Sequence, residues 1–89
     1  MEIHVKLQFD KNFSRLSFMP TNSIQIVVNG DSLDLPAGTT ILVLLHELQV
    51  KPDRVAVELD RLIVKSTAWA ETTLSSGSKV EIVHFVGGG

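Results

Sequence analysis

Residues 24–35 have the sequence IQIVVNGDSLDL, in which large apolar residues recur at every second position on both sides of Asn29-Gly30. A period of two is typical of a strand that buries one face. Asn-Gly is the preferred pair for a two-residue type I′ turn, because both turn positions need a positive φ. The stretch therefore predicts a β-hairpin.

One amphipathic helix is predicted after this hairpin. The segment at residues 36–38, Pro-Ala-Gly, breaks the second strand, and Thr39 or Thr40 can cap a helix by accepting a hydrogen bond from a free backbone N–H. Apolar residues then recur at helical spacing over about residues 40–49. They are Ile41, Leu44, Leu45 and Leu48.

Three further strands are predicted after the helix. Residues 55–59 and 62–64 alternate on either side of a turn at residues 60–61, which is typical of a second hairpin. Trp69 is expected to fill one end of the core. A last strand follows a polar turn and has the alternating residues Val80, Ile82 and His84.

The order β-β-α-β-β-β predicts an α+β fold, the ubiquitin-like β-grasp, in which a mixed sheet has one main helix packed on one face. The last strand should lie beside the first, in the middle of the sheet. We expect this domain to span residues 24–86, with residues 87–89 as a flexible glycine tail. The predicted core consists of Ile26, Val28, Leu44, Leu45, Leu48, Val55, Val57, Val80 and Ile82.

Strand parity predicts which side chains point away from the helix. Because Val80 and Ile82 face the core, the residues between and after them face the other side of the sheet. We expect that side to be a docking surface for partners, apolar with acidic residues beside it. A cover formed by residues 3–9, or ordinary exposed apolar surface, are the alternatives. The expected docking residues are Val27, Ala56, Glu58, Glu81, Val83 and Phe85 on that side, together with Val86 at the start of the glycine tail.

Residues 1–23 are predicted to be an N-terminal extension and linker. Apolar and polar residues alternate over residues 3–9, which indicates a strand, whereas residues 10–23 have no period. Met19 is an alternative translation start, which would make the preceding residues an upstream extension.

The composition excludes several classes of function. Eight Lys and Arg against ten Asp and Glu give a formal net charge of −2 without a basic cluster, so neither nucleic acid nor a membrane is an expected partner. The chain has no cysteine, and its three histidines lack metal-ligand spacing, so we expect no metal site. No signal peptide or membrane span is recognisable, which predicts a cytoplasmic protein.

The sequence sets apart one reactive group, the α-carboxylate of Gly89. The side-chain carboxylates lack the cleft that acid–base catalysis needs, so we expect no enzyme. A carboxylate is an anion at neutral pH and a poor electrophile until ATP adenylates it. Gly87 and Gly88 have no Cβ, so an extended tail can enter a narrow channel at low steric cost. The alternative is a frayed tail or a cloning scar.

Residues 24–89 resemble the ThiS/MoaD family of ubiquitin-like sulfur carriers. The resemblance rests on the hairpin at residues 26–30, the helix at residues 40–45, the strand at residues 55–58 and the final sequence VEIVHFVGGG. It implies that an E1-like adenylyltransferase of the ThiF type uses ATP to adenylate Gly89, which becomes a thiocarboxylate. A donor such as a cysteine desulfurase supplies the sulfur, and a thiazole synthase of the ThiG type receives it in thiamine biosynthesis.

The resemblance also implies that the chain is a carrier and co-substrate, with no bound cofactor, and not an enzyme. A molybdopterin-synthase-type carrier usually has a proline before its glycines, whereas this chain has Val-His-Phe-Val, which favours the thiamine branch. A ubiquitin-like protein modifier and an inert interaction module share the fold and stay open. The chain departs from the family pattern at Asp60-Arg61, at Ser78 and over residues 1–23.

Overall fold

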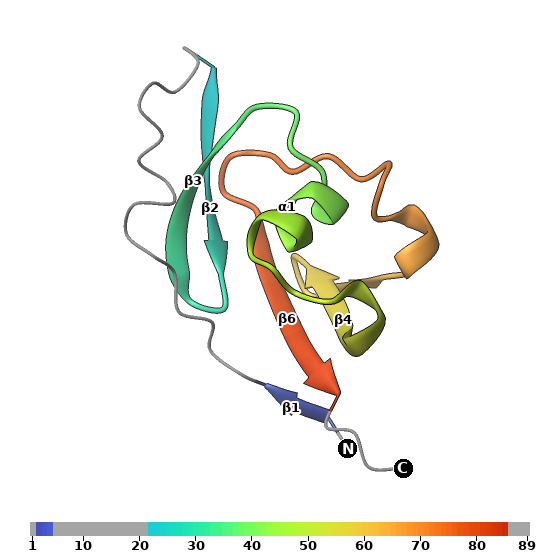
Figure 1. Cartoon of the computed structure of the whole chain (residues 1–89). Coiled ribbons are helices and arrows are strands. Elements are labelled where there is room, and N and C mark those ends of the chain that lie inside the picture. Colours follow the sequence, from blue (N-terminus) through green and yellow to red (C-terminus); the bar gives the residue numbers. More distant parts are fainter. Residues whose placement is uncertain (1, 5–21, 86–89) are drawn as a thin grey trace.

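The computed structural model describes residues 2–4 and 22–85, with side chains for residues 22–85. No helix in these ranges is long and apolar enough to cross a membrane. Figure 1 shows a single α-helix packed across a twisted sheet. The strands and helices are β1 (Glu2–His4), β2 (Ser23–Val28), β3 (Asp31–Pro36), α1 (Ile41–Glu47), the 3₁₀ turn η1 (Pro52–Arg54), β4 (Val55–Leu59), β5 (Leu62–Val64), the 3₁₀ turn η2 (Ser66–Ala68) and β6 (Lys79–Phe85).

The sheet has the strand order β3-β2-β6-β4-β5, and β1 pairs with β6 outside this path. Strands β2 and β6 are parallel, and the other pairs are antiparallel. The last strand therefore lies in the middle of a mixed sheet beside the first strand of the hairpin. This confirms the predicted β-grasp fold.

The first hairpin turns as predicted. Val28 is opposite Asp31, so the loop contains only Asn29 and Gly30, whose φ angles are +47° and +89°. Two positive φ angles define the type I′ turn, and its twist matches that of the two strands. Alternate residues of β2 and β3, from Ile26 to Leu35, then enter the core.

The helix is shorter than the predicted span of residues 40–49. It begins as expected, because the Thr40 side chain accepts a hydrogen bond of 3.2 Å from the Val43 N–H. It ends at Glu47 because Gln49 takes a left-handed φ of +60° and the N–H of Val50 bonds to the carbonyl of Leu45. This is the Schellman ending, which usually has glycine at the position that Gln49 occupies here.

Eight of the nine predicted core residues are buried, and Leu48 is the exception. Leu48 caps the helix end and is only partly buried against the core. Trp69 fills one end of the core as expected, with its indole N–H donating a hydrogen bond of 2.8 Å to the Val64 carbonyl. The remaining buried apolar residues are Leu33, Leu35, Ile41, Val50 and Leu74.

Replacing Leu45 by alanine should lower the free energy of unfolding by about 2–5 kcal/mol, because Leu45 is fully buried and its removal leaves a cavity. Leu42 lies on the same helix and is 39% exposed, so Leu42→Ala should cost less than about 1 kcal/mol. Urea denaturation measures both losses. Equal losses for the two variants would contradict the helix register.

Candidate functional site

The site centres on the end of β6, where the chain leaves the sheet toward its glycines. β6 is described up to Phe85, whereas Val86, Gly87, Gly88 and Gly89 lie outside the described residues. The structure therefore describes the base of the predicted tail and the surfaces beside it.

Asn29 holds β6 in place where β2 ends. β2 pairs with β6 only at Lys79 and Val80. At Ile82, two residues further along β6, the Asn29 side chain replaces β2 as the hydrogen-bond partner. Its Oδ1 accepts a hydrogen bond of 2.7 Å from the Ile82 N–H, and its Nδ2 donates one of 3.2 Å to the Ile82 carbonyl. The amide thus bonds to β6 as the backbone of a neighbouring strand would, so β6 is fixed beyond the length of β2.

The second hairpin turn holds the start of β6. The Asp60 N–H donates to the Lys79 carbonyl at 2.8 Å, and the Lys79 N–H donates to Asp60 Oδ1 at 2.9 Å. Asp60 and Arg61 have positive φ angles of +51° and +74°, although neither is glycine. Such a backbone costs about 1 kcal/mol or more per residue. The bonds between Asp60 and Lys79 help to offset this cost.

The sheet face opposite α1, here called the open face, brings together the described residues predicted from strand parity. Ala56 is directly opposite Val83, and Glu58 is directly opposite Glu81. Phe85 follows on the same face and is 42% exposed, whereas the other predicted residues are half-buried. The open face consists of Val27, Ala56, Glu58, Ile63, Glu81, Val83 and Phe85.

Ile63 was missed by the sequence reasoning. It is opposite Glu58 in the β4–β5 hairpin and is 73% exposed, which makes it a prominent apolar residue of the open face. A three-residue strand gives too short an alternation to assign faces alone. The register of the hairpin would have placed Ile63 on the open face, because a two-residue turn at residues 60–61 pairs Ile63 with Glu58.

The open face combines apolar contact area with negative charge. Directly opposed residues on one face of a sheet have Cβ atoms about 4.5–5.5 Å apart, so the Glu58 and Glu81 carboxylates are neighbours. Like charges in this position destabilise the sheet. The pair therefore places negative charge on this part of the open face.

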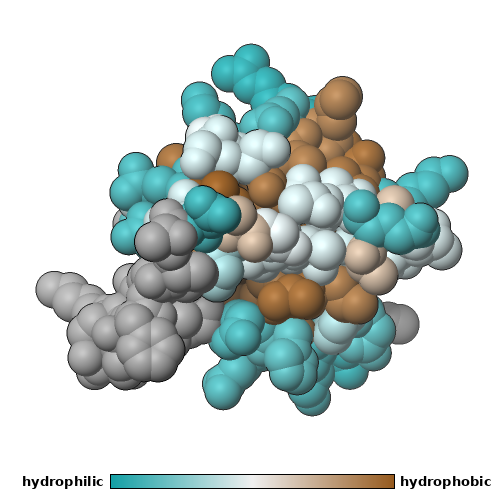
Figure 2. Space-filling model, turned by 90° about the horizontal axis from the view of Figure 1, so that it is seen from above, coloured by the Kyte–Doolittle hydropathy of each residue, from teal (hydrophilic) through white to brown (hydrophobic). Residues whose placement is uncertain are grey.

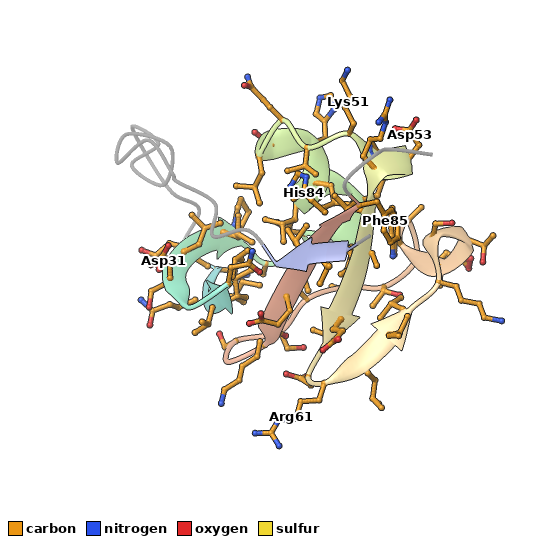
Figure 3. All side chains as sticks on the ribbon, turned by 90° about the horizontal axis from the view of Figure 1, so that it is seen from below. Asp31, Lys51, Asp53, Arg61, His84 and Phe85 are labelled. Carbon is orange, nitrogen blue, oxygen red and sulfur yellow. The ribbon has the colours of Figure 1, made fainter. Side chains whose placement is uncertain are left out.

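The three histidines lie on three different elements. His84 is opposite the buried Val55 and lies on the side that α1 covers, as Figure 3 shows, with Nε2 buried and without a hydrogen-bond partner in the described part of the chain. His46 is exposed on α1, and His4 lies in β1. Among the side chains of residues 22–85, no three of His, Asp or Glu come together as metal ligands.

Apolar exposure is not confined to the open face. Leu42 and Val43 on α1 and Leu62 on β5 are also exposed. Figure 2 shows apolar side chains in separate areas with paler residues between them. The open face therefore differs from other apolar surface by its position at the end of β6 and by its paired carboxylates.

Comparison with known proteins places this geometry in a family. A model of the ThiS family matches residues 21–89. Thiazole synthases of Paramagnetospirillum magneticum and Magnetococcus marinus are 39% and 36% identical over 66 residues. Each match covers 74% of this chain but only 20% of the synthase, so the chain spans a fifth of the length of these relatives.

A solved structure supports the same relationship. The crystal structure of the thiamine biosynthesis protein ThiS from Geobacter metallireducens matches with a TM-score of 0.66 and 30% sequence identity. The match covers 74% of this chain and 100% of that protein. The structural comparison thus agrees with the β-grasp fold found here.

Proposed function

The chain belongs to the ThiS family, and on that premise we propose that it is a sulfur carrier of thiamine biosynthesis, with the sulfur carried on the C-terminal carboxylate of Gly89. The observation that carries the proposal is the family match over residues 21–89, which includes the whole sheet core and the glycines. The similarity to a thiamine biosynthesis protein of solved structure supports the same pathway.

The proposed chemistry has two steps at Gly89. An oxygen of the carboxylate attacks the α-phosphorus of ATP, the bond to pyrophosphate breaks, and a mixed anhydride with AMP forms. A hydrosulfide equivalent from a sulfur donor then attacks the carbonyl carbon and releases AMP, which leaves a thiocarboxylate. A ThiF-type adenylyltransferase supplies the ATP site, so this chain is a co-substrate and contributes the reacting group and the surface that presents it.

A thiazole synthase is the proposed acceptor of the sulfur. The relatives named thiazole synthase contain a stretch of 66 residues similar to this chain, and that stretch is a fifth of their length. A carrier segment and a synthase that are joined in one chain act on each other at high effective concentration. We propose that the same contact forms between separate chains here.

We propose that the open face is where both partners dock. It lies on the strand that leads into the tail, so a partner bound there holds the tail at a fixed point. Phe85 and Ile63 supply exposed apolar area, and the Glu58–Glu81 pair supplies charge complementarity to a basic surface. Because one face serves both partners, the activating enzyme and the synthase bind in turn.

Adding one residue after Gly89 should abolish adenylation, because the reacting carboxylate is then replaced by an amide. ATP–pyrophosphate exchange by the ThiF-type enzyme, with the extended chain as substrate, measures this step. The extended chain should unfold in urea at the same concentration as the unmodified chain, since no residue of the core changes. Exchange at the normal rate without prior trimming would contradict Gly89 as the acceptor.

Replacing Phe85 by alanine should weaken binding to the activating enzyme by about 1–2 kcal/mol or more, as truncation of interface aromatics does. Calorimetric titration of the enzyme with each variant measures this. Leu62→Ala is the matched control, because Leu62 is 72% exposed but lies on the other side of the sheet. Equal affinities for Phe85→Ala, Leu62→Ala and the unmodified chain would contradict the docking role of the open face.

A further inference from the structure

One backbone edge of β6 is paired by three different parts of the chain in succession. β4 pairs with the opposite edge as far as His84. On the edge in question, β2 covers Lys79 and Val80, and the Asn29 amide then covers Ile82. Neither β2 nor Asn29 reaches the last three residues of β6.

β1 covers this remaining length. Glu2 is opposite Phe85, Ile3 is opposite His84 and His4 is opposite Val83, in an antiparallel arrangement. Figures 1 and 3 both show β1 lying against the end of β6. β1 thus extends the sheet at its edge, beside the point where the tail begins, and the pairing does not place it across the open face.

One short pairing links β1 to the sheet. β1 pairs with β6 alone, over three residues, and residues 5–22 separate it from β2 in the sequence. A three-residue strand that pairs with a single neighbour belongs to the parts of a fold that open at low free-energy cost.

An uncovered strand edge is a template for another strand. Its free N–H and carbonyl groups accept an extended segment in register, which is how β-augmentation recognises peptides. Without β1, the N–H and carbonyl of His84 would be free on the side of β6 away from β4, because alternate residues of a strand direct their backbone groups to the same edge and Ile82 directs its own to Asn29. This edge lies at the last residues of β6, four residues before Gly89 in the sequence.

We propose that the edge of β6 at residues 83–85 is a strand-addition site and that β1 of the same chain occupies it. An extended segment of a protein partner binds there only by displacing β1. A strand tethered to its site acts at an effective concentration of order millimolar. β1 therefore outcompetes extended segments that bind weakly, and only a segment that binds more tightly than β1 occupies the site. The site itself does not depend on the proposed sulfur chemistry.

The test uses the full chain with Ile3→Pro, and with Ile3→Val as the matched control. Proline at the middle of β1 removes a backbone N–H and fixes φ, so it disrupts pairing, whereas valine favours a strand. The probe is a fluorescent peptide with the sequence of residues 1–10, MEIHVKLQFD. Fluorescence anisotropy measures its affinity for each chain.

The Ile3→Pro chain should bind the peptide at least about fivefold more tightly than the unmodified and Ile3→Val chains, because the competing cis strand is lost. Amide hydrogen exchange at His84 should be faster in Ile3→Pro, because its N–H lies on the edge that β1 covers, and unchanged at Ile82 and Val83. Equal peptide binding by the three chains would overturn the proposal. An Ile3→Pro chain that fails to fold would also overturn it, since β1 would then be part of the stable domain. A concentration-dependent dimer in which two copies exchange their β1 strands would overturn it as well.

Discussion

The two hydrogen bonds between the Asn29 amide and the Ile82 backbone are the constraint on which the placement of the second half of β6 depends. β2 leaves β6 after Val80, yet β6 continues to Phe85 in the centre of the sheet. A side chain in the type I′ turn supplies the donor and acceptor that a longer β2 would have supplied. Asn29 therefore both forms the turn of the first hairpin and aligns the last strand. That alignment decides which residues of β6 lie on the open face.

The same arrangement suits the proposed carrier function. One helix covers one face of the sheet, which leaves Phe85, Val83 and Ile63 on the other face for a partner. In the proposed function the reacting group is the carboxylate of Gly89, and the partner supplies the site for the ATP and sulfur chemistry. What this domain has to provide is a rigid strand up to the point where the tail starts and a surface that both partners recognise.

Local sequence signals predicted the elements, whereas long-range contacts escaped them. Asn29-Gly30 identified the hairpin, Thr40 was one of two candidate caps, and strand parity separated the core from the open face. The helix end was misplaced because Gln49 adopts a left-handed conformation without being glycine. No local pattern indicates that the Asn29 side chain bonds to Ile82 or that β1 pairs with the end of β6, since both contacts join residues far apart in the sequence.

The intact mass of the chain after incubation with ATP, a sulfide source and the ThiF-type activating enzyme tests the central claim most directly. The account predicts a mass increase equal to the replacement of one oxygen by sulfur, located at Gly89 and absent when ATP is omitted. An unchanged mass with the active enzyme present would contradict the carrier function. Amide-linked adducts between Gly89 and lysines of other proteins would also contradict it, because they would identify a protein modifier.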